Sequence, residues 1–98
     1  MISCSQEDDM INEHDFTGTV DQWERRVFCA AAKFRVHRFY GQGQHDSCEV
    51  DTFENAIRTV GDVRRAMPGA RVTVYAIAAS GRFTMLTESR WAEYLEAA

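Results

Sequence analysis

The sequence predicts an α+β fold in which a leading helix is followed by two ββα units. The four strands are expected to form a mostly antiparallel sheet with the helices packed on one face. Three observations favour this fold: apolar residues recur first at helical spacing, they then alternate with a period of two, and this succession occurs twice along the chain. A length of 98 residues with 45% hydrophobic content is typical of one domain with one core.

Charge divides the chain into an acidic beginning and a slightly basic remainder. Residues 1–24 contain seven acidic and no basic side chains, whereas residues 25–98 hold all 11 basic side chains and the other eight acidic ones, for a net charge of −4. Together with the lack of periodicity over residues 1–18, this predicts a mobile acidic N-terminal arm ahead of a single α+β domain at residues 19–98. An alternative is that residues 7–24 act as an inhibitor-type arm that shields a basic face or mimics a polyanion.

No feature of the sequence indicates a membrane segment or an export signal. The apolar runs fall short of the roughly 18 residues that a membrane helix needs. The acidic start has neither the basic nor the apolar region of a signal peptide. The sequence therefore predicts a cytoplasmic protein without a membrane partner.

The leading helix is predicted over residues 20–31. Thr19 and Gln22 have the spacing of a capping box, in which each side chain accepts a hydrogen bond from the backbone of the other residue. Trp23 and Val27 then begin an apolar stripe at helical spacing.

Two strands follow, and their pairing can be derived from the loop between them. A three-residue hairpin loop over residues 41–43 needs a left-handed residue where it closes, and Gly43 meets that need. Closing the hairpin there pairs residues 34–40 with residues 44–50 and places Arg35 opposite Glu49. The resulting opposite-charge and apolar pairs are those that stabilise a sheet. A slip of one residue would turn every side chain to the other face.

A second amphipathic helix is predicted to start at Asp51 with Glu54 and to end at Pro68-Gly69. Its stripe of apolar residues faces the sheet. Gly61 costs about 1 kcal/mol relative to Ala inside a helix, so we expect it to serve a close approach of the helix to the sheet.

The second hairpin is predicted to turn at Ser80-Gly81. A two-residue turn there places Ala76 opposite Met85 and Tyr75 opposite Leu86, with small residues against large ones on one face. Phe83 and Met85 would then face the helices. Ser89 is expected to cap a last helix, whose Trp91, Tyr94 and Leu95 dock on the sheet.

When the first half of the chain is aligned with the second half at one constant difference in residue number, Val36 matches Val74 and Gly43 matches Gly81. We call this difference the repeat offset. The matches are of structural role more than of identity, and they suggest a pseudo-repeat of ββα units. Such units are similar to those of many small bacterial proteins, but the residues identify no family.

The sheet face away from the helices is predicted to be an interaction surface. An antiparallel face that contacts water is normally polar, whereas alternation places four apolar side chains on this one. Apolar surface with a polar rim is typical of an interaction site, and a small domain often buries such surface by self-association. The alternative is that the helix at residues 20–31 covers the face within one chain. The predicted surface consists of Phe39, Tyr75, Ile77, Leu86, Arg35 and His37.

Nucleic acid is the main alternative partner. Lys33, Arg35 and Tyr75, with His37 and Phe39, could contact phosphates and stack on bases, as in sheet-based single-strand binders. The small positive charge of residues 25–98 and the acidic residues ahead of them argue against polyanion binding.

Catalysis and metal binding are not expected. His37 and His45 share a face, but Cys48 points to the other side of the sheet, so no metal site is predicted. Alternation also separates neighbouring groups in residues 46–49, and no phosphate loop, dinucleotide fingerprint or nucleophile motif is present. We therefore expect a non-enzymatic interaction or regulatory module without a cofactor, which binds itself as a homodimer or binds another protein.

Overall fold

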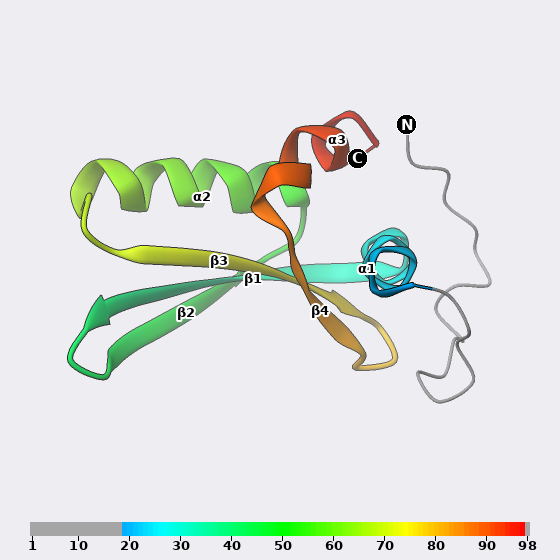
Figure 1. Cartoon of the computed structure of the whole chain (residues 1–98), viewed down its shortest axis with the longest axis horizontal. Coiled ribbons are helices and arrows are strands. Elements are labelled where there is room, and N and C mark those ends of the chain that lie inside the picture. The colour runs from blue at the N-terminus through cyan, green and yellow to red at the C-terminus, as the bar shows by residue number, and fades with distance from the viewer. Residues whose placement is uncertain (1–18, 98) are drawn as a thin grey trace.

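The fold consists of one layer of helices on one face of a four-stranded sheet. The computed structural model describes residues 19–97, so the predicted arm over residues 1–18 lies outside the described residues. Neighbouring strands are antiparallel in the order β2-β1-β3-β4, which confirms the predicted α+β class (Figure 1). None of the described helices is long and apolar enough to cross a membrane. In chain order the elements are α1 (Val20–Cys29), β1 (Ala31–Gly41), β2 (Gln44–Val50), α2 (Phe53–Ala66), β3 (Arg71–Ala78), β4 (Phe83–Leu86), the 3-10 turn η3 (Glu88–Arg90) and α3 (Trp91–Ala97).

Helix α1 begins at the capping box predicted from the sequence. Thr19 Oγ1 accepts a hydrogen bond from Gln22 N at 3.1 Å, and Thr19 N donates to Gln22 Oε1 at 2.8 Å. The helix ends at Cys29, two residues earlier than predicted, because Ala31 already pairs with Ala78 at the start of β1.

One buried carboxylate attaches α1 to the end of the chain. Glu24 is 4% exposed, and its Oε1 accepts hydrogen bonds from Thr87 Oγ1 at 2.7 Å and from Thr87 N at 3.3 Å. Its Oε2 accepts from the Tyr94 hydroxyl and lies 3.5 Å from Nη1 of Arg90, which also pairs with Asp21. Burial and the hydrogen bond to Glu24 raise the pKa of Tyr94 above its ordinary value. The hydroxyl therefore stays protonated and remains a donor.

The core lies between the helices and one face of the sheet. Val36 and Val74 lie at its centre and are fully buried. Phe28, Phe53 and Tyr94 join the three α-helices through ring contacts, with centroids 4.4 to 6.0 Å apart. Of the three residues predicted to dock, Trp91 and Tyr94 are buried in this core, whereas Leu95 is 39% exposed.

The caps of the two later helices differ from the prediction. The N-cap of α2 is Thr52, whose Oγ1 accepts from Asn55 N at 3.1 Å, and not Asp51. Ser89 lies inside η3, so it does not cap α3. A Cβ on Gly61 would meet no atom within 4 Å beyond its own helix backbone, so the close approach expected at this glycine is absent.

The register of the first hairpin is the predicted one. All predicted pairs between residues 34–39 and residues 45–50 are present. The predicted pair of Tyr40 with Gln44 is wrong: Gly41 pairs with Gln44, and Tyr40 is the extra residue of an irregularity in β1. The turn consists of Gln42 and Gly43 alone, with φ of 54° and 79°. Two central residues with positive φ are what a type I′ turn requires.

The register of the second hairpin is shifted by one residue from the prediction. Tyr75 pairs with Met85 and not with Leu86. The cause is the loop, which comprises residues 79–81 instead of two residues and closes at Gly81 with φ of 95°. Because a shift of one residue reverses the face of every side chain in a strand, the predicted faces of β4 are wrong.

The pseudo-repeat predicted from the repeat offset is present in the strand pairing. Moving the pairs of the first hairpin along the chain by this offset reproduces the pairs of the second, so that His37–Ser47 corresponds to Tyr75–Met85. Between the hairpins, Val36 lies opposite its own equivalent, Val74. A pseudo-two-fold axis normal to the sheet therefore passes between β1 and β3 and relates the two hairpins.

Loss of the Glu24 carboxylate should destabilise the protein, because it leaves the buried Tyr94 hydroxyl without an acceptor. We expect Glu24→Ala to lower the free energy of unfolding in urea by about 2–4 kcal/mol. Glu93→Ala removes only the partly exposed pair with Arg25 at 3.8 Å and should change it by less than about 0.5 kcal/mol. Equal effects of the two substitutions would contradict the role assigned to Glu24.

Two glycine-to-alanine substitutions should change stability in opposite directions. Gly61→Ala should raise the free energy of unfolding by about 0.5–1 kcal/mol, since the site is helical and has open space. Gly43→Ala should lower it by about 1–2 kcal/mol, since its φ is 79°. Thermal unfolding followed by circular dichroism measures both, and changes of the same sign would contradict the assigned backbone conformations.

Candidate interaction surface

The sheet face opposite the core has no described helix on it (Figure 1). The alternative that α1 covers this face is wrong, because Val27 and Phe28 of α1 belong to the same core as Phe53 of α2. Outward-pointing side chains of all four strands form the surface, which we call the open face. The open face consists of Lys33, Arg35, His37, Phe39, His45, Ser47, Glu49, Arg71, Thr73, Tyr75, Ile77, Phe83 and Met85.

One half of the open face is apolar. Tyr75 and Ile77 on β3 pair with Met85 and Phe83 on β4, and we call these four residues the apolar cluster. Phe83 is 64% exposed and Met85 is 50% exposed, whereas Ile77 is nearly covered by its neighbours. The Tyr75 and Phe83 rings meet edge to face with centroids 6.2 Å apart. A shallow depression of about 340 Å³ lies between this cluster and Arg35.

Leu86 does not belong to this surface, contrary to the prediction. It is 2% exposed and packs in the core on the helix side. The shifted register of β4 is the reason, and the same shift brings Phe83 and Met85, which were predicted to face the helices, onto the open face. The repeat offset could have found them, because it maps His45 and Ser47 onto Phe83 and Met85.

The other half of the open face holds three rings in mutual contact, two pairs tilted and one edge to face. His37, Phe39 and His45 form what we call the imidazole cluster, with centroids 4.4 Å apart for His37–Phe39, 5.0 Å for His37–His45 and 5.6 Å for Phe39–His45. His37 Nε2 lies 3.1 Å from His45 Nδ1. Phe39 is 39% exposed, so the cluster presents both apolar and nitrogen surface to its surroundings.

The basic residues of the open face that were predicted to contact a ligand are paired with an acidic neighbour. Glu49 binds Arg35 Nη2 at 2.8 Å and Lys33 Nζ at 2.9 Å. These hydrogen bonds, first that of Arg35 and then that of Lys33, lower the pKa of Glu49 below its ordinary value. The carboxylate therefore neutralises part of the positive charge that a nucleic acid would need.

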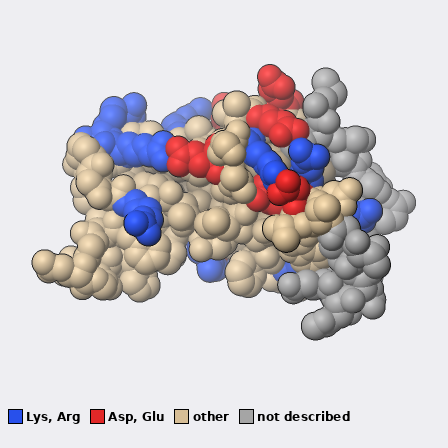
Figure 2. Space-filling view, in the orientation of Figure 1, with Lys and Arg blue, Asp and Glu red and all other residues tan. Residues whose placement is uncertain are grey.

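Most charged side chains in view lie elsewhere. Figure 2 shows them gathered over the helices in the upper part of the molecule. Among the helices, Arg64 of α2 pairs with Glu88 of η3, and Arg90 of η3 pairs with Asp21 of α1.

The described residues contain no cluster of three or more His, Cys, Asp and Glu side chains that could hold a metal ion. The stretch of residues 46–49 is divided between the two sides of the sheet, as predicted. Asp46 binds Arg38 and Tyr40, whereas Glu49 binds Arg35 on the open face. These carboxylates are already used by ion pairs and hydrogen bonds.

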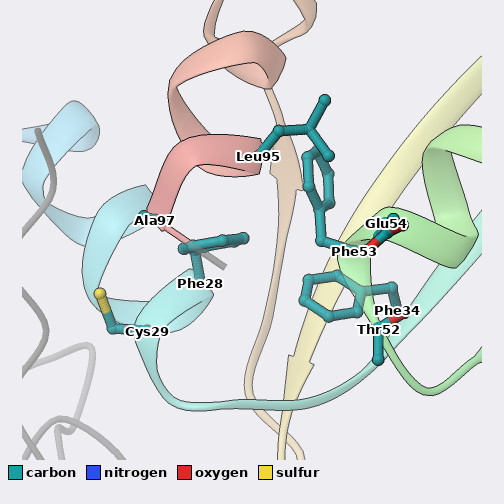
Figure 3. Close-up of a pocket in the computed structure, with 8 residues that line it drawn as sticks. All are labelled: Phe28, Cys29, Phe34, Thr52, Phe53, Glu54, Leu95 and Ala97. Atoms are coloured by element: carbon teal, nitrogen blue, oxygen red, sulfur yellow. The ribbon is translucent and has the colours of Figure 1, made fainter.

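A second hollow lies on the helix side, where the ends of α1, α2 and α3 meet (Figure 3). It measures about 580 Å³, and its wall is mainly the rings of Phe28, Phe34 and Phe53 with Leu95. Its polar groups come from Thr52 and Glu54 at the start of α2.

Comparison with protein-family models, with curated proteins and with solved structures returns no match for this chain.

The face assignment of β4 can be tested with neighbouring residues. Leu86→Ala should lower the free energy of unfolding by about 2–5 kcal/mol, because it opens a cavity in the core. Met85→Ala should change it by less than about 1 kcal/mol, because Met85 is half exposed. Urea denaturation at low protein concentration measures both, and the reverse order would contradict the observed register.

Proposed function

We propose that this protein is a non-enzymatic interaction or regulatory module that self-associates through its open face. The observation that carries the proposal is the apolar cluster, in which Phe83 and Met85 are 64% and 50% exposed on a sheet face without a described helix. Burying a large apolar side chain stabilises a protein by about 1.5–3 kcal/mol relative to leaving it exposed. A partner that covers several of them gains a comparable free energy for each.

A second copy of the chain suits this face for two reasons. The apolar cluster is compact and can pack against itself across a two-fold axis, as in most homodimers. The cations beside it, Lys33 and Arg35, are paired within the chain by Glu49. Lys33 and Arg35 therefore cause little charge repulsion when two copies of the apolar cluster approach each other. A cytoplasmic location is part of the same proposal.

The other two candidate functions have less support. A single-stranded nucleic acid would have to compete with Glu49 for Lys33 and Arg35. An inhibitor-type arm over residues 7–24 falls mostly outside the described residues. Its two described acidic side chains, Asp21 and Glu24, are bound to Arg90 within the fold.

A charge placed in the apolar cluster should weaken self-association without unfolding the monomer. We expect Tyr75→Glu and Phe83→Glu each to raise the dimer dissociation constant by about 10- to 100-fold, because both would desolvate a carboxylate at the interface. Sedimentation velocity over a concentration series measures the constant, and circular dichroism checks the fold.

The matched control is Val20→Glu, which adds the same charge at an 83% exposed apolar position on α1. It should leave the dissociation constant unchanged. A wild-type protein that stays monomeric at every concentration would contradict the proposal, as would a Val20→Glu effect equal to that of Phe83→Glu.

A further inference from the structure

The two histidines of the imidazole cluster form a ready pair of nitrogen ligands. His37 Nε2 and His45 Nδ1 lie 3.1 Å apart on the open face. Zinc binds imidazole nitrogen at about 2.0–2.1 Å, so two ligands at a tetrahedral angle lie about 3.3–3.4 Å apart. The two nitrogen atoms contact each other as hydrogen-bond partners, so metal binding would replace this hydrogen bond and turn both lone pairs toward the ion. The register of β1 and β2 keeps the two residues diagonal to one another.

This pair does not complete a metal site within one chain. Zinc takes four ligands in a structural site, and the described residues offer no third metal-ligating side chain there. The free thiol of Cys48 belongs to the helix side of the sheet, and Asp46 binds Arg38. The remaining two ligands must come from outside the described part of the chain.

We propose that a second copy supplies them. In this inference, which rests on the proposed self-association, His37 and His45 of two chains bind one divalent transition metal ion at the dimer interface. Four neutral imidazoles in a tetrahedral arrangement suit Zn²⁺, and imidazole also binds Ni²⁺ and Cu²⁺. The metal site is incomplete without both copies.

The layout of the open face allows one two-fold axis to satisfy both clusters. The pseudo-two-fold axis of the sheet maps His37 and His45 onto Tyr75 and Phe83, so the two clusters lie on opposite sides of the centre. If the two-fold axis of the dimer lies in the interface along the line that joins the two clusters, each cluster of one chain faces the same cluster of the other chain. Apolar surface then meets apolar surface, and one histidine pair meets the other.

The distance between two packed sheets suits such an arrangement, but the area of the face is small. Packed sheets lie about 10 Å apart, so each imidazole has to reach only about half that distance to meet its counterpart. Residues 33–39 along the strands and four strands across them span roughly 24 by 19 Å. This area is smaller than the area of about 800 Å² that a standard interface buries on each partner. Association through the side chains of this face alone is therefore expected to be weak, which leaves room for a metal ion to strengthen it.

The experiment uses tag-free full-length protein from which metal has been removed with a chelator. Sedimentation velocity is recorded over a concentration series with and without Zn²⁺, and bound zinc is counted. We expect Zn²⁺ to lower the dimer dissociation constant by about tenfold or more, with one ion for two chains. His37→Ala and His45→Ala should each abolish this shift, measured for each variant as the ratio of its own dissociation constants with and without Zn²⁺.

Two control variants test other zinc ligands. His14→Ala removes the remaining histidine, which lies outside the described residues, and Cys48→Ser removes the thiol on the helix side. Both should keep the full response to Zn²⁺. A loss of response in either variant would overturn the assignment of the site to His37 and His45.

The outcomes separate this inference from the proposed function. Metal-free dimerisation that Phe83→Glu abolishes and Zn²⁺ leaves unchanged would overturn the metal site alone. One zinc ion on each monomer would also overturn it. A wild-type chain that is monomeric with and without Zn²⁺ would overturn both proposals. A chain that dimerises only with Zn²⁺ and through His37 and His45 would support the metal site and show that self-association needs the ion.

Discussion

The buried carboxylate of Glu24 holds α1 on the helix side of the sheet together with Val27 and Phe28 in the core, and no described helix therefore lies on the open face. Its donors are Thr87, Tyr94 and Arg90, all on the helix side near the end of the chain. Moving α1 to the open face would leave this carboxylate without them. A buried charge that loses its partner costs about 3–5 kcal/mol, whereas covering one aromatic ring gains about 1.5–3 kcal/mol. The hydrogen bonds of Glu24 and the burial of Val27 and Phe28 therefore both keep the helix in the core layer.

How far the sequence predicts the fold is best seen in the two hairpins. In the first, charge pairs such as Arg35–Glu49 and the apolar pairs all favour one register. The predicted register is therefore correct although the predicted loop length is not. In the second, β4 has only four residues, and it lacks charged pairs that could reveal a slip. Ser80-Gly81 looks like a two-residue turn, and the wrong loop length placed Leu86 on the wrong face. The repeat offset already contained the correct register.

Other features depend on contacts that local patterns do not contain. Glu24 stands in an acidic stretch and looks like a solvent-exposed residue, while its partners Thr87 and Tyr94 follow 63 and 70 residues later. The meeting of His37 Nε2 and His45 Nδ1 is of the same kind, because alternation predicts a shared face but not the orientation of rings. The sequence thus predicts the candidate site as a surface, but it assigns the residues of β4 to the wrong face. The contact between the two imidazole nitrogen atoms is visible only in the structure.

The pseudo-symmetry also bears on how two copies of the open face would dock. The two halves keep similar core positions, such as Val36 and Val74, but they differ on the open face, where His37 and His45 correspond to Tyr75 and Phe83. In a second two-fold arrangement, the imidazole cluster of each chain would face the apolar cluster of the other chain. Burying an imidazole N–H without an acceptor costs about 1–3 kcal/mol. The arrangement that places like on like avoids this cost, because it keeps the nitrogen atoms together and the apolar rings together. A platform with two chemically different halves therefore favours one mode of self-association over the other, which an open face of uniform composition would not do.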